Sequence, residues 1–220
     1  MNKKITFVSD FDGTISDEDF FHHLRDNVFD DSALMPWNDY LEGKISHFDA
    51  LKNIYGTLRV CDKKIVDLVK KVTIDEWVIP TFKLLHKNNV PIYIASAGCD
   101  YYINLLIGEE LKKYNITLIT NPSSYSKDLG LVMERPEKTS AFYDEHIGIS
   151  KEKLVKFLQD NNQYVVFAGD GPPDFEPAKI ADVVFAKKIL LDKCLEINVK
   201  TEKFDNYEDI FLFFKKELSK

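Results

Sequence analysis

Four short apolar runs constrain the fold of this chain more than any other feature. They are rich in Val, Ile and aromatic residues and lack polar–apolar alternation: Ile5–Val8, Ile92–Ala95, Tyr164–Ala168 and Val183–Ala186. Runs of this kind are typical of strands buried on both faces of a parallel sheet. Because helical segments separate the runs, the sequence predicts an α/β fold with a doubly wound parallel sheet. In such sheets ligands bind beyond the carboxyl ends of the strands.

Several segments have the spacing of helices that would cover this sheet. They are Pro80–Lys87, Lys151–Gln159 with Ser150 as its N-cap, Phe175–Ile180, and the apolar tail Ile210–Phe214. Residues 120–140 contain Pro122, Gly130 and Pro136 among polar residues, which predicts a loop with a hairpin.

The first and second runs are separated by far more chain than one crossover helix needs. Apolar residues recur at helical spacing within Ile45–Leu58 and Lys64–Val72. We therefore expect an inserted α-helical cap over residues 17–77. The remaining residues, 1–16 and 78–220, would form the α/β core.

The composition excludes several functions. The formal net charge is −7 and no run of Lys and Arg occurs, so we expect no nucleic-acid partner. No apolar stretch approaches the length of a membrane span, and the first apolar run is too short for a signal peptide. The three scattered cysteines indicate free thiols in a reducing compartment, and we expect a cytoplasmic protein. The sequence carries no signal for an oligomeric state.

Two carboxylates follow the first apolar run directly, in Asp10-Phe11-Asp12-Gly13-Thr14. Side chains two positions apart on a strand share a face, so Asp10 and Asp12 should project into one site. Two adjacent carboxylates repel each other unless a cation lies between them or one holds a proton. A hard cation such as Mg²⁺ meets this requirement and leaves positions open for a phosphate.

Further candidate residues follow the other strands. The second run leads into Ser96-Ala97-Gly98, where a hydroxyl and a backbone N–H can cradle phosphate oxygens. Lys151 opens a helix, where an anion is favoured, although Lys138 and Lys153 are alternatives. Gly169-Asp170 and Asp174 place two more carboxylates beyond a strand. Asp174 is also a candidate N-cap for the helix Phe175–Ile180.

The order of these four elements closely resembles the phosphatases of the haloacid dehalogenase-like (HAD) superfamily, which have a Rossmann-like core. Within it, the stretches Asp10–Ile15, Ser96–Tyr102 and Gly169–Ala186 resemble the MtnX-type 2-hydroxy-3-keto-5-methylthiopentenyl-1-phosphate phosphatases of methionine salvage. The phosphoserine phosphatases are a neighbouring family with a similar helical cap.

The resemblance implies a magnesium-dependent phosphomonoester hydrolase with an aspartyl-phosphate intermediate. It makes Asp10 the nucleophile and Asp12 the general acid and base. Ser96, Ala97 and Lys151 would bind phosphate. The Mg²⁺ ligands would come from Asp10, Asp12, Asp170 and Asp174, with Asp12 contributing its backbone carbonyl and Asp174 orienting bound waters.

The expected partner is a small phosphorylated metabolite, with Asp19, Tyr55 and Arg59 as candidate substrate contacts from the cap. The methionine-salvage enol phosphate and phosphoserine are both open. The salvage enzymes carry a cysteine-rich insert before the motif lysine, whereas this chain has no cysteine in 137–150. The phosphoserine phosphatases carry a glutamate at the position of Asp19.

Alternatives of other classes also share an aspartate cluster. A phosphate-accepting receiver module would carry its acceptor on the third strand and would lack a helical insert. A dehalogenase of the same superfamily would not need Asp12, whose carboxylate suits proton transfer to an ester oxygen. A non-catalytic binding protein would not need all four elements.

Overall fold

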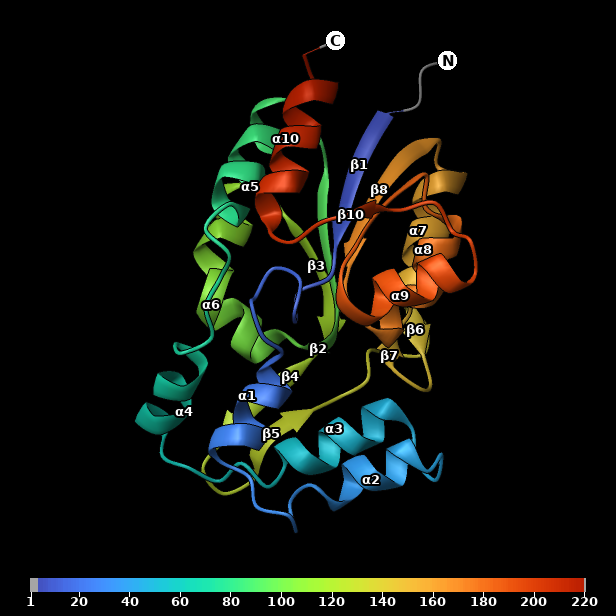
Figure 1. Cartoon of the computed structure of the whole chain (residues 1–220). Helices are drawn as coiled ribbons and strands as arrows, with labels where there is room; N and C mark the ends of the chain where they lie inside the picture. Colours follow the sequence, from blue (N-terminus) through green and yellow to red (C-terminus); the bar gives the residue numbers. More distant parts are fainter. Residues whose placement is uncertain (1–3, 220) are drawn as a thin grey trace.

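The computed structural model describes residues 4–219, and a six-stranded parallel sheet forms its centre (Figure 1). The strand order is β10 (Glu202–Lys203), β9 (Val183–Ala186), β8 (Gln163–Gly169), β1 (Lys4–Ser9), β2 (Ile92–Cys99) and β3 (Thr117–Asn121). The four apolar runs form the four middle strands, which confirms the predicted α/β fold. The apolar runs did not predict the edge strands β3 and β10. Most residues of β3 are half-buried and both residues of β10 are exposed, so neither strand needs a continuous apolar run.

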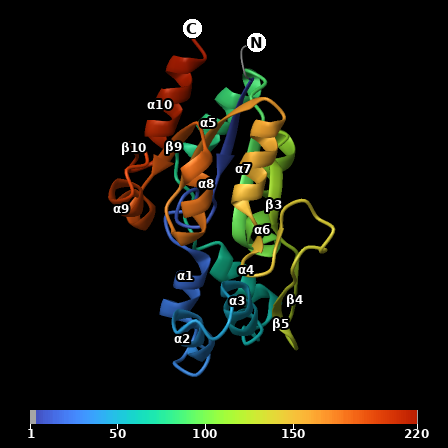
Figure 2. The ribbon, with the colours of Figure 1, turned by 90° about the vertical axis from the view of Figure 1, so that its right-hand side faces the viewer.

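Helices cover both faces of the sheet (Figures 1 and 2). One face carries α5 (Val78–Lys87), α6 (Asp100–Lys113) and α10 (Tyr207–Glu217), and the other carries α7 (Lys151–Asp160), α8 (Phe175–Ile180) and α9 (Lys188–Glu196). Successive side chains of β1 point to opposite faces of the sheet. The ring centre of Phe7 lies 5.1 Å from that of Phe214 on α10, whereas Val8 belongs to the core cluster that contains the buried side chains of α7. Within residues 4–219 no helix is long and apolar enough to cross a membrane.

Strand β2 is longer than its apolar run indicates. The sequence predicts Ile92–Ala95, but the strand continues to Cys99, and its register against β3 shifts between Ala95 and Cys99. Ser96 and Ala97 therefore lie within this irregular end of the strand rather than after it. Such irregularities occur often beside active sites, where they redirect side chains.

Four helices lie beyond the carboxyl ends of the strands (Figure 1). They are α1 (Phe20–Asn27), α2 (Met35–Leu41), α3 (His47–Tyr55) and α4 (Asp62–Val69). The two ends of this insert meet at one point, because Ser16 and Ile74 form an antiparallel bridge. Hydrogen bonds from Asp17 N to Thr73 O (3.0 Å) and from Asp75 N to Ile15 O (3.1 Å) flank that bridge.

The hairpin expected within residues 120–140 is present as β4 (Ser123–Ser126) and β5 (Gly130–Met133), and it packs against α3 rather than joining the sheet. Arg135, just after the hairpin, lies 2.9 Å from Asp49 and stacks its guanidinium 4.0 Å from the ring centre of Phe48. The hairpin therefore supports the inserted helices from a distant part of the chain. A short ladder of β6 (Tyr143–Asp144) and β7 (Gly148–Ile149) then leads to α7.

Candidate active site

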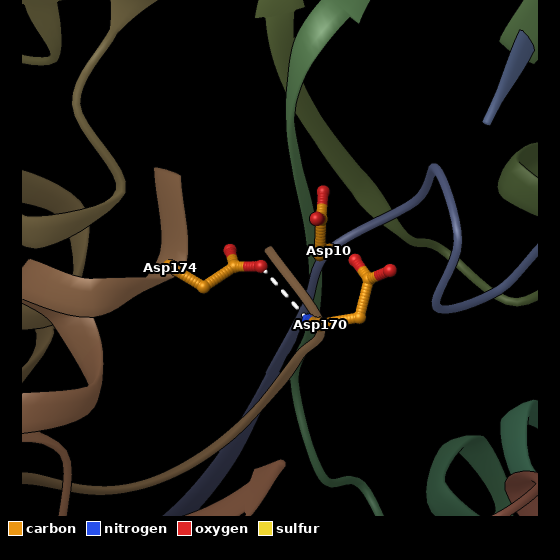
Figure 3. A group of neighbouring side chains, drawn as sticks. All are labelled: Asp10, Asp170 and Asp174. Carbon is orange, nitrogen blue, oxygen red and sulfur yellow. Dashed lines mark hydrogen bonds between the residues drawn. The ribbon is translucent and has the colours of Figure 1, made fainter. Parts of the chain in front are cut away.

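Three carboxylates meet at the carboxyl ends of the two central strands. Asp10 follows β1, Asp170 follows β8, and Asp174 ends the short 3₁₀ turn η1 (Pro172–Asp174). One oxygen from each of the three lies within 4.8 Å of the others, and Figure 3 shows them around one point. This convergence follows from the sheet, because parallel neighbouring strands end at the same edge.

The buried ammonium of Lys151 lies among these carboxylates. Lys151 Nζ is 2.7 Å from Asp10 Oδ1 and 2.6 Å from Asp174 Oδ1, and the side chain is 1% exposed. Burial opposes the charged form, but the charges of Asp10 and Asp174 outweigh it and raise the pKa of Lys151. Lys151 therefore stays charged. It begins α7, whose N-cap Ser150 accepts a hydrogen bond from Lys153 N, as the sequence predicts.

Asp174 stands at the N-cap position of α8, but its side chain makes no capping bond there. Its Oδ2 instead accepts hydrogen bonds from the backbone N–H groups of Asp170 (3.0 Å) and Gly171 (3.1 Å). Asp174 is therefore the N-cap residue of α8 by position, as the sequence predicts, but its side chain does not cap that helix. Asp174 fixes the turn that carries Asp170, and its other oxygen holds Lys151.

The chemistry of this set suits a hard metal ion. Burial, and then the charge of Asp174, raise the pKa of Asp10 well above its ordinary value, and they raise the pKa of Asp170 too. The Lys151 ammonium therefore does not fully compensate the buried charge of these carboxylates. Carboxylate oxygens are the ligands that Mg²⁺ prefers, so Asp10, Asp170 and Asp174 form a set that can hold such an ion.

A second lysine contacts Asp170. Lys188 Nζ lies 2.9 Å from Asp170 Oδ2 and donates to Gly13 O at 3.0 Å. Gly13 has φ +71°, and a Cβ there would lie 2.3 Å from Asp170 Oδ2, so only glycine fits. The sequence analysis did not select Lys188. Its place just past the carboxyl end of β9 is the signal that would have identified it.

Asp12 lies in a separate environment. Its Oδ1 accepts from Phe20 N (3.2 Å), and its Oδ2 accepts from Ser96 Oγ (3.1 Å) and the Tyr102 hydroxyl (2.5 Å). Burial, and then the charge of Asp19, raise the pKa of Asp12 to about 7, against the effect of these hydrogen bonds. Asp12 can therefore bind and release a proton near neutral pH.

Ser96 and Ala97 are held by a buried asparagine that sequence reasoning missed. Asn121 Nδ2 donates to the carbonyls of Ala97 (2.9 Å) and Gly98 (3.0 Å), and Gly98 N donates to Ser96 Oγ (3.0 Å). These bonds fix the irregular end of β2. Asn121 was missed because it ends β3, the edge strand that the pattern did not reveal.

A cavity of about 540 Å³ joins these groups to the inserted helices. Its lining includes the predicted residues Asp10, Asp12, Ser96, Ala97, Lys151 and Asp170. Asp19 and Tyr55 also line it, whereas Arg59 is exposed and is not among its lining residues. One face of α3 supplies a stripe, formed by His47, Leu51 and Tyr55, in which each side chain lies four positions after the previous one.

Cys99 is the last residue of β2, and its thiol has no reactive character. It is fully buried, and burial raises the pKa of its thiol to about 12. A thiolate is the nucleophilic form, so Cys99 is a packing residue.

No family model matches the chain. The chain is 25% identical over 208 residues to 2-hydroxy-3-keto-5-methylthiopentenyl-1-phosphate phosphatases of Bacillus thuringiensis (strain Al Hakam) and Bacillus anthracis, and the match covers 94% of this chain and of each relative. The chain is a HAD-type phosphatase, distantly homologous to these enzymes.

Solved structures of HAD-type phosphatases share the fold. A substrate-bound phosphoserine phosphatase superposes with a TM-score of 0.67 at 17% identity, covering 97% of this chain and 99% of that one. A phosphoserine phosphatase with a phospho-aspartyl intermediate analogue gives 0.67 at 18% identity, covering 96% and 99%. A phosphoserine phosphatase from T. onnurineus gives 0.64 at 15% identity, covering 97% and 95%.

Proposed function

We propose that this HAD-type phosphatase hydrolyses a small phosphorylated metabolite with Asp10 as the nucleophile and Mg²⁺ as the cofactor. The proposal is supported above all by the contacts of the Asp10 carboxylate and by its position in the cavity. Its carboxylate lines the cavity, contacts the Lys151 ammonium at 2.7 Å, and belongs to the three-carboxylate set that can hold a metal ion.

Asp12 supplies the proton that the reaction needs. In the first half, a bond forms between an Asp10 carboxylate oxygen and phosphorus while the bond from phosphorus to the leaving oxygen breaks. The leaving oxygen keeps the electron pair and takes the proton of Asp12. In the second half, Asp12 accepts a proton from water, the water oxygen bonds to phosphorus, and the Asp10 carboxylate is released.

Ser96, Ala97 and Lys151 bind the phosphoryl oxygens in this proposal. Ser96 and Lys151 line the same cavity as Asp10, and the hydrogen bond from Asn121 holds the Ala97 carbonyl in place. Fixed donors of this kind stabilise the negative charge of a transferring phosphoryl group without reorganising.

Mg²⁺ would be held by Asp10, Asp170 and the backbone carbonyl of Asp12, with Asp174 orienting bound water. When bound, the ion neutralises the repulsion between nucleophile and phosphate. The bonds already made by Asp174 support its indirect role, because one of its oxygens holds Lys151 and the other holds two backbone N–H groups.

Residues 17–77 would act as a cap over a core made of residues 1–16 and 78–220. The bridge between Ser16 and Ile74 supports this division, since the insert leaves and rejoins the core there. Closure of a cap excludes water and brings selecting side chains onto the leaving group. The hairpin β4–β5 would move with the cap because it packs on α3.

The cavity favours a substrate whose alcohol carries no carboxylate. Among the described residues, its lysines are Lys151 and Lys188, and both already pair with carboxylates. The part formed by the inserted helices offers Phe21, Trp37, Leu51 and Tyr55 instead. The enol phosphate named for the Bacillus relatives has this chemistry, and we propose it as the first candidate substrate.

Phosphoserine is the second candidate, and Asp19 supports it. Asp19 lines the cavity, and burial raises the pKa of Asp19 to about 6, so at neutral pH its carboxylate can pair with an ammonium group. The substrate's own carboxylate would still need a cation, which makes this candidate the weaker one.

Phosphate release from a panel of esters tests the proposal. The panel holds 4-nitrophenyl phosphate, the methionine-salvage enol phosphate, phosphoserine, phosphocholine, pyridoxal phosphate and sugar phosphates, each with Mg²⁺ or with a chelator, beside Asp10→Asn. We expect metal-dependent release that Asp10→Asn abolishes. Release that survives in Asp10→Asn would overturn the proposal. The fastest ester identifies the substrate.

A further inference from the structure

The Tyr102 hydroxyl makes the shortest hydrogen bond to Asp12, and the proposed reaction steps do not use this hydroxyl. It lies 2.5 Å from Asp12 Oδ2, on α6, and the residue is 1% exposed. Its ring packs 4.5 Å from the ring of Phe20 and 6.0 Å from that of Phe11. The core therefore fixes the direction in which the hydroxyl points.

The absence of a side chain at Gly98 leaves the space in which the Tyr102 hydroxyl reaches Asp12. A Cβ on Gly98 would lie 1.8 Å from the Tyr102 hydroxyl oxygen and 3.0 Å from Asp12 Oδ2. Any side chain at this position would occupy the space of the hydroxyl. The close approach accounts for a glycine inside a buried strand, where glycine otherwise weakens the structure.

Three donors leave one acceptor position of Asp12 open. A carboxylate has four lone-pair positions. Ser96 and Tyr102 occupy the two on Oδ2, and Phe20 N occupies one on Oδ1. The transferable proton therefore belongs on Oδ1, at its remaining position.

Ser96 cannot serve Asp12 and the substrate together. A hydroxyl has one proton to donate, so Ser96 must leave Asp12 Oδ2 when it turns to a phosphoryl oxygen. Tyr102 then remains as the donor to Oδ2. Its fixed ring keeps that hydrogen bond while the substrate is bound.

We propose that Tyr102 is a positioning residue that holds Asp12 Oδ2 during turnover, so that Oδ1 delivers the proton to the leaving oxygen. The inference rests on the proposed function, in which Asp12 is the general acid. Proton delivery matters for an alkoxide leaving group, which is strongly basic, and hardly at all for 4-nitrophenolate, which departs without a proton. Removing the Tyr102 hydroxyl should therefore slow the hydrolysis of an alkyl phosphate more than that of 4-nitrophenyl phosphate.

The test is the kcat/KM of Tyr102→Phe for 4-nitrophenyl phosphate and for the alkyl phosphate that the panel hydrolyses fastest. Phenylalanine keeps the ring contacts and removes only the hydroxyl. We expect about a tenfold loss with the alkyl ester and less than about a twofold loss with the nitrophenyl ester. Equal losses for both esters, or no loss with the alkyl ester, would overturn the inference.

Tyr101→Phe is the matched control. Tyr101 is the neighbouring residue on α6, but its ring packs on Tyr125 and is not among the lining residues of the cavity. We expect both rates to stay at the wild-type level in this variant. If Tyr102→Phe does not fold, as judged by its thermal unfolding, Gly98→Ala replaces it. The added methyl group displaces the hydroxyl, and the alkyl ester should again lose more rate than the nitrophenyl ester; an unchanged ratio overturns the inference.

Asp12→Asn separates failure of this inference from failure of the proposed function. If Asp12→Asn hydrolyses the alkyl ester at the wild-type rate, Asp12 is not the general acid, and both this inference and the role of Asp12 in the proposed function fall. If Asp12→Asn loses activity while Tyr102→Phe does not, only the role of Tyr102 falls. In the double variant, Tyr102→Phe should add no further loss to Asp12→Asn, and additive losses would contradict the coupling.

Discussion

Lys151 Nζ lies 2.7 Å from Asp10 Oδ1, and both side chains are buried. The contact joins the first residue of α7 to the end of β1, in the centre of the sheet. A charge removed from water in this way is stable only with its partner present. The ion pair therefore links the stability of the core to the reactivity of the proposed nucleophile.

Replacing Lys151 with methionine should destabilise the metal-free protein by about 3–5 kcal/mol, because it leaves buried carboxylates without their counter-ion. Urea unfolding in the presence of a chelator measures the loss. Lys156→Met is the matched control on the same helix, since Lys156 is 69% exposed and its ion pair with Asp160 spans 3.6 Å. We expect the control to cost less than about 1 kcal/mol. A Lys151→Met variant as stable as the control would contradict the structural role of the ion pair.

Magnesium should stabilise the folded protein by binding to the carboxylates of Asp10 and Asp170. At about 100 times its dissociation constant, a ligand that binds only the folded state adds about 2.7 kcal/mol. Thermal unfolding with and without Mg²⁺ shows this as a rise in the unfolding temperature. Asp170→Asn should remove most of the rise, whereas Asp67→Asn, at an exposed position on α4, should keep it. An equal rise in both variants would place the ion elsewhere.

His47 should make the protein sensitive to acid. Its ring lies 5.8 Å from Trp37 and 5.3 Å from Tyr40, and its Nδ1 has no hydrogen-bond partner within residues 4–219. Burial, and then the charge of Lys151, lower the pKa of His47 to about 4.

Because the pKa of His47 is lower in the folded state than in the unfolded state, the protein becomes less stable as the pH falls. Above about pH 6.5 His47 is neutral in both states, so its contribution is fully present. As the pH falls from about 6.5 to about 4, the unfolded state binds the proton first, and about 2–3 kcal/mol of stability is lost. The variant His47→Phe has no histidine to titrate at this position. The free energy of unfolding of the wild type should therefore fall relative to that of the variant as the pH is lowered from about 6.5 to about 4. A constant difference between the two proteins would contradict the burial of a neutral His47.

Tyr55 should contribute to substrate binding. Its side chain is 1% exposed and lines the cavity, and its hydroxyl has no hydrogen-bond partner among the described residues. Tyr55→Phe should raise KM for the preferred substrate about fivefold, the value of one hydrogen bond, with kcat nearly unchanged. Tyr164→Phe, on β8 outside the cavity, should change neither constant. If Tyr55→Phe lowers kcat and leaves KM unchanged, the hydroxyl acts on the chemistry instead.

The central part of the fold could be predicted because buried strands need continuous apolar runs. That requirement reveals β1, β2, β8 and β9, but not the half-exposed edge strand β3. The end of β2 was also missed, since Ser96–Cys99 contains no further Val or Ile to mark a strand.

The candidate site was predictable where residues follow strands. Asp10 and Asp170 lie together because β1 and β8 are parallel neighbours. Tyr102 and Lys188 project from helices, and their positions depend on how those helices pack, which the local sequence does not determine. Arg59 was selected only for its place in the insert, and the fold leaves it exposed.

The most direct test of the account is chemical capture of the phosphorylated enzyme. The protein is mixed with the preferred ester, radiolabelled at phosphorus, and quenched in acid within one turnover. After digestion, the labelled peptide is identified by mass spectrometry. We predict a hydroxylamine-sensitive phosphate on Asp10 that Asp10→Asn does not form. Turnover at the normal rate without label on Asp10, or with label on another residue, would contradict the account.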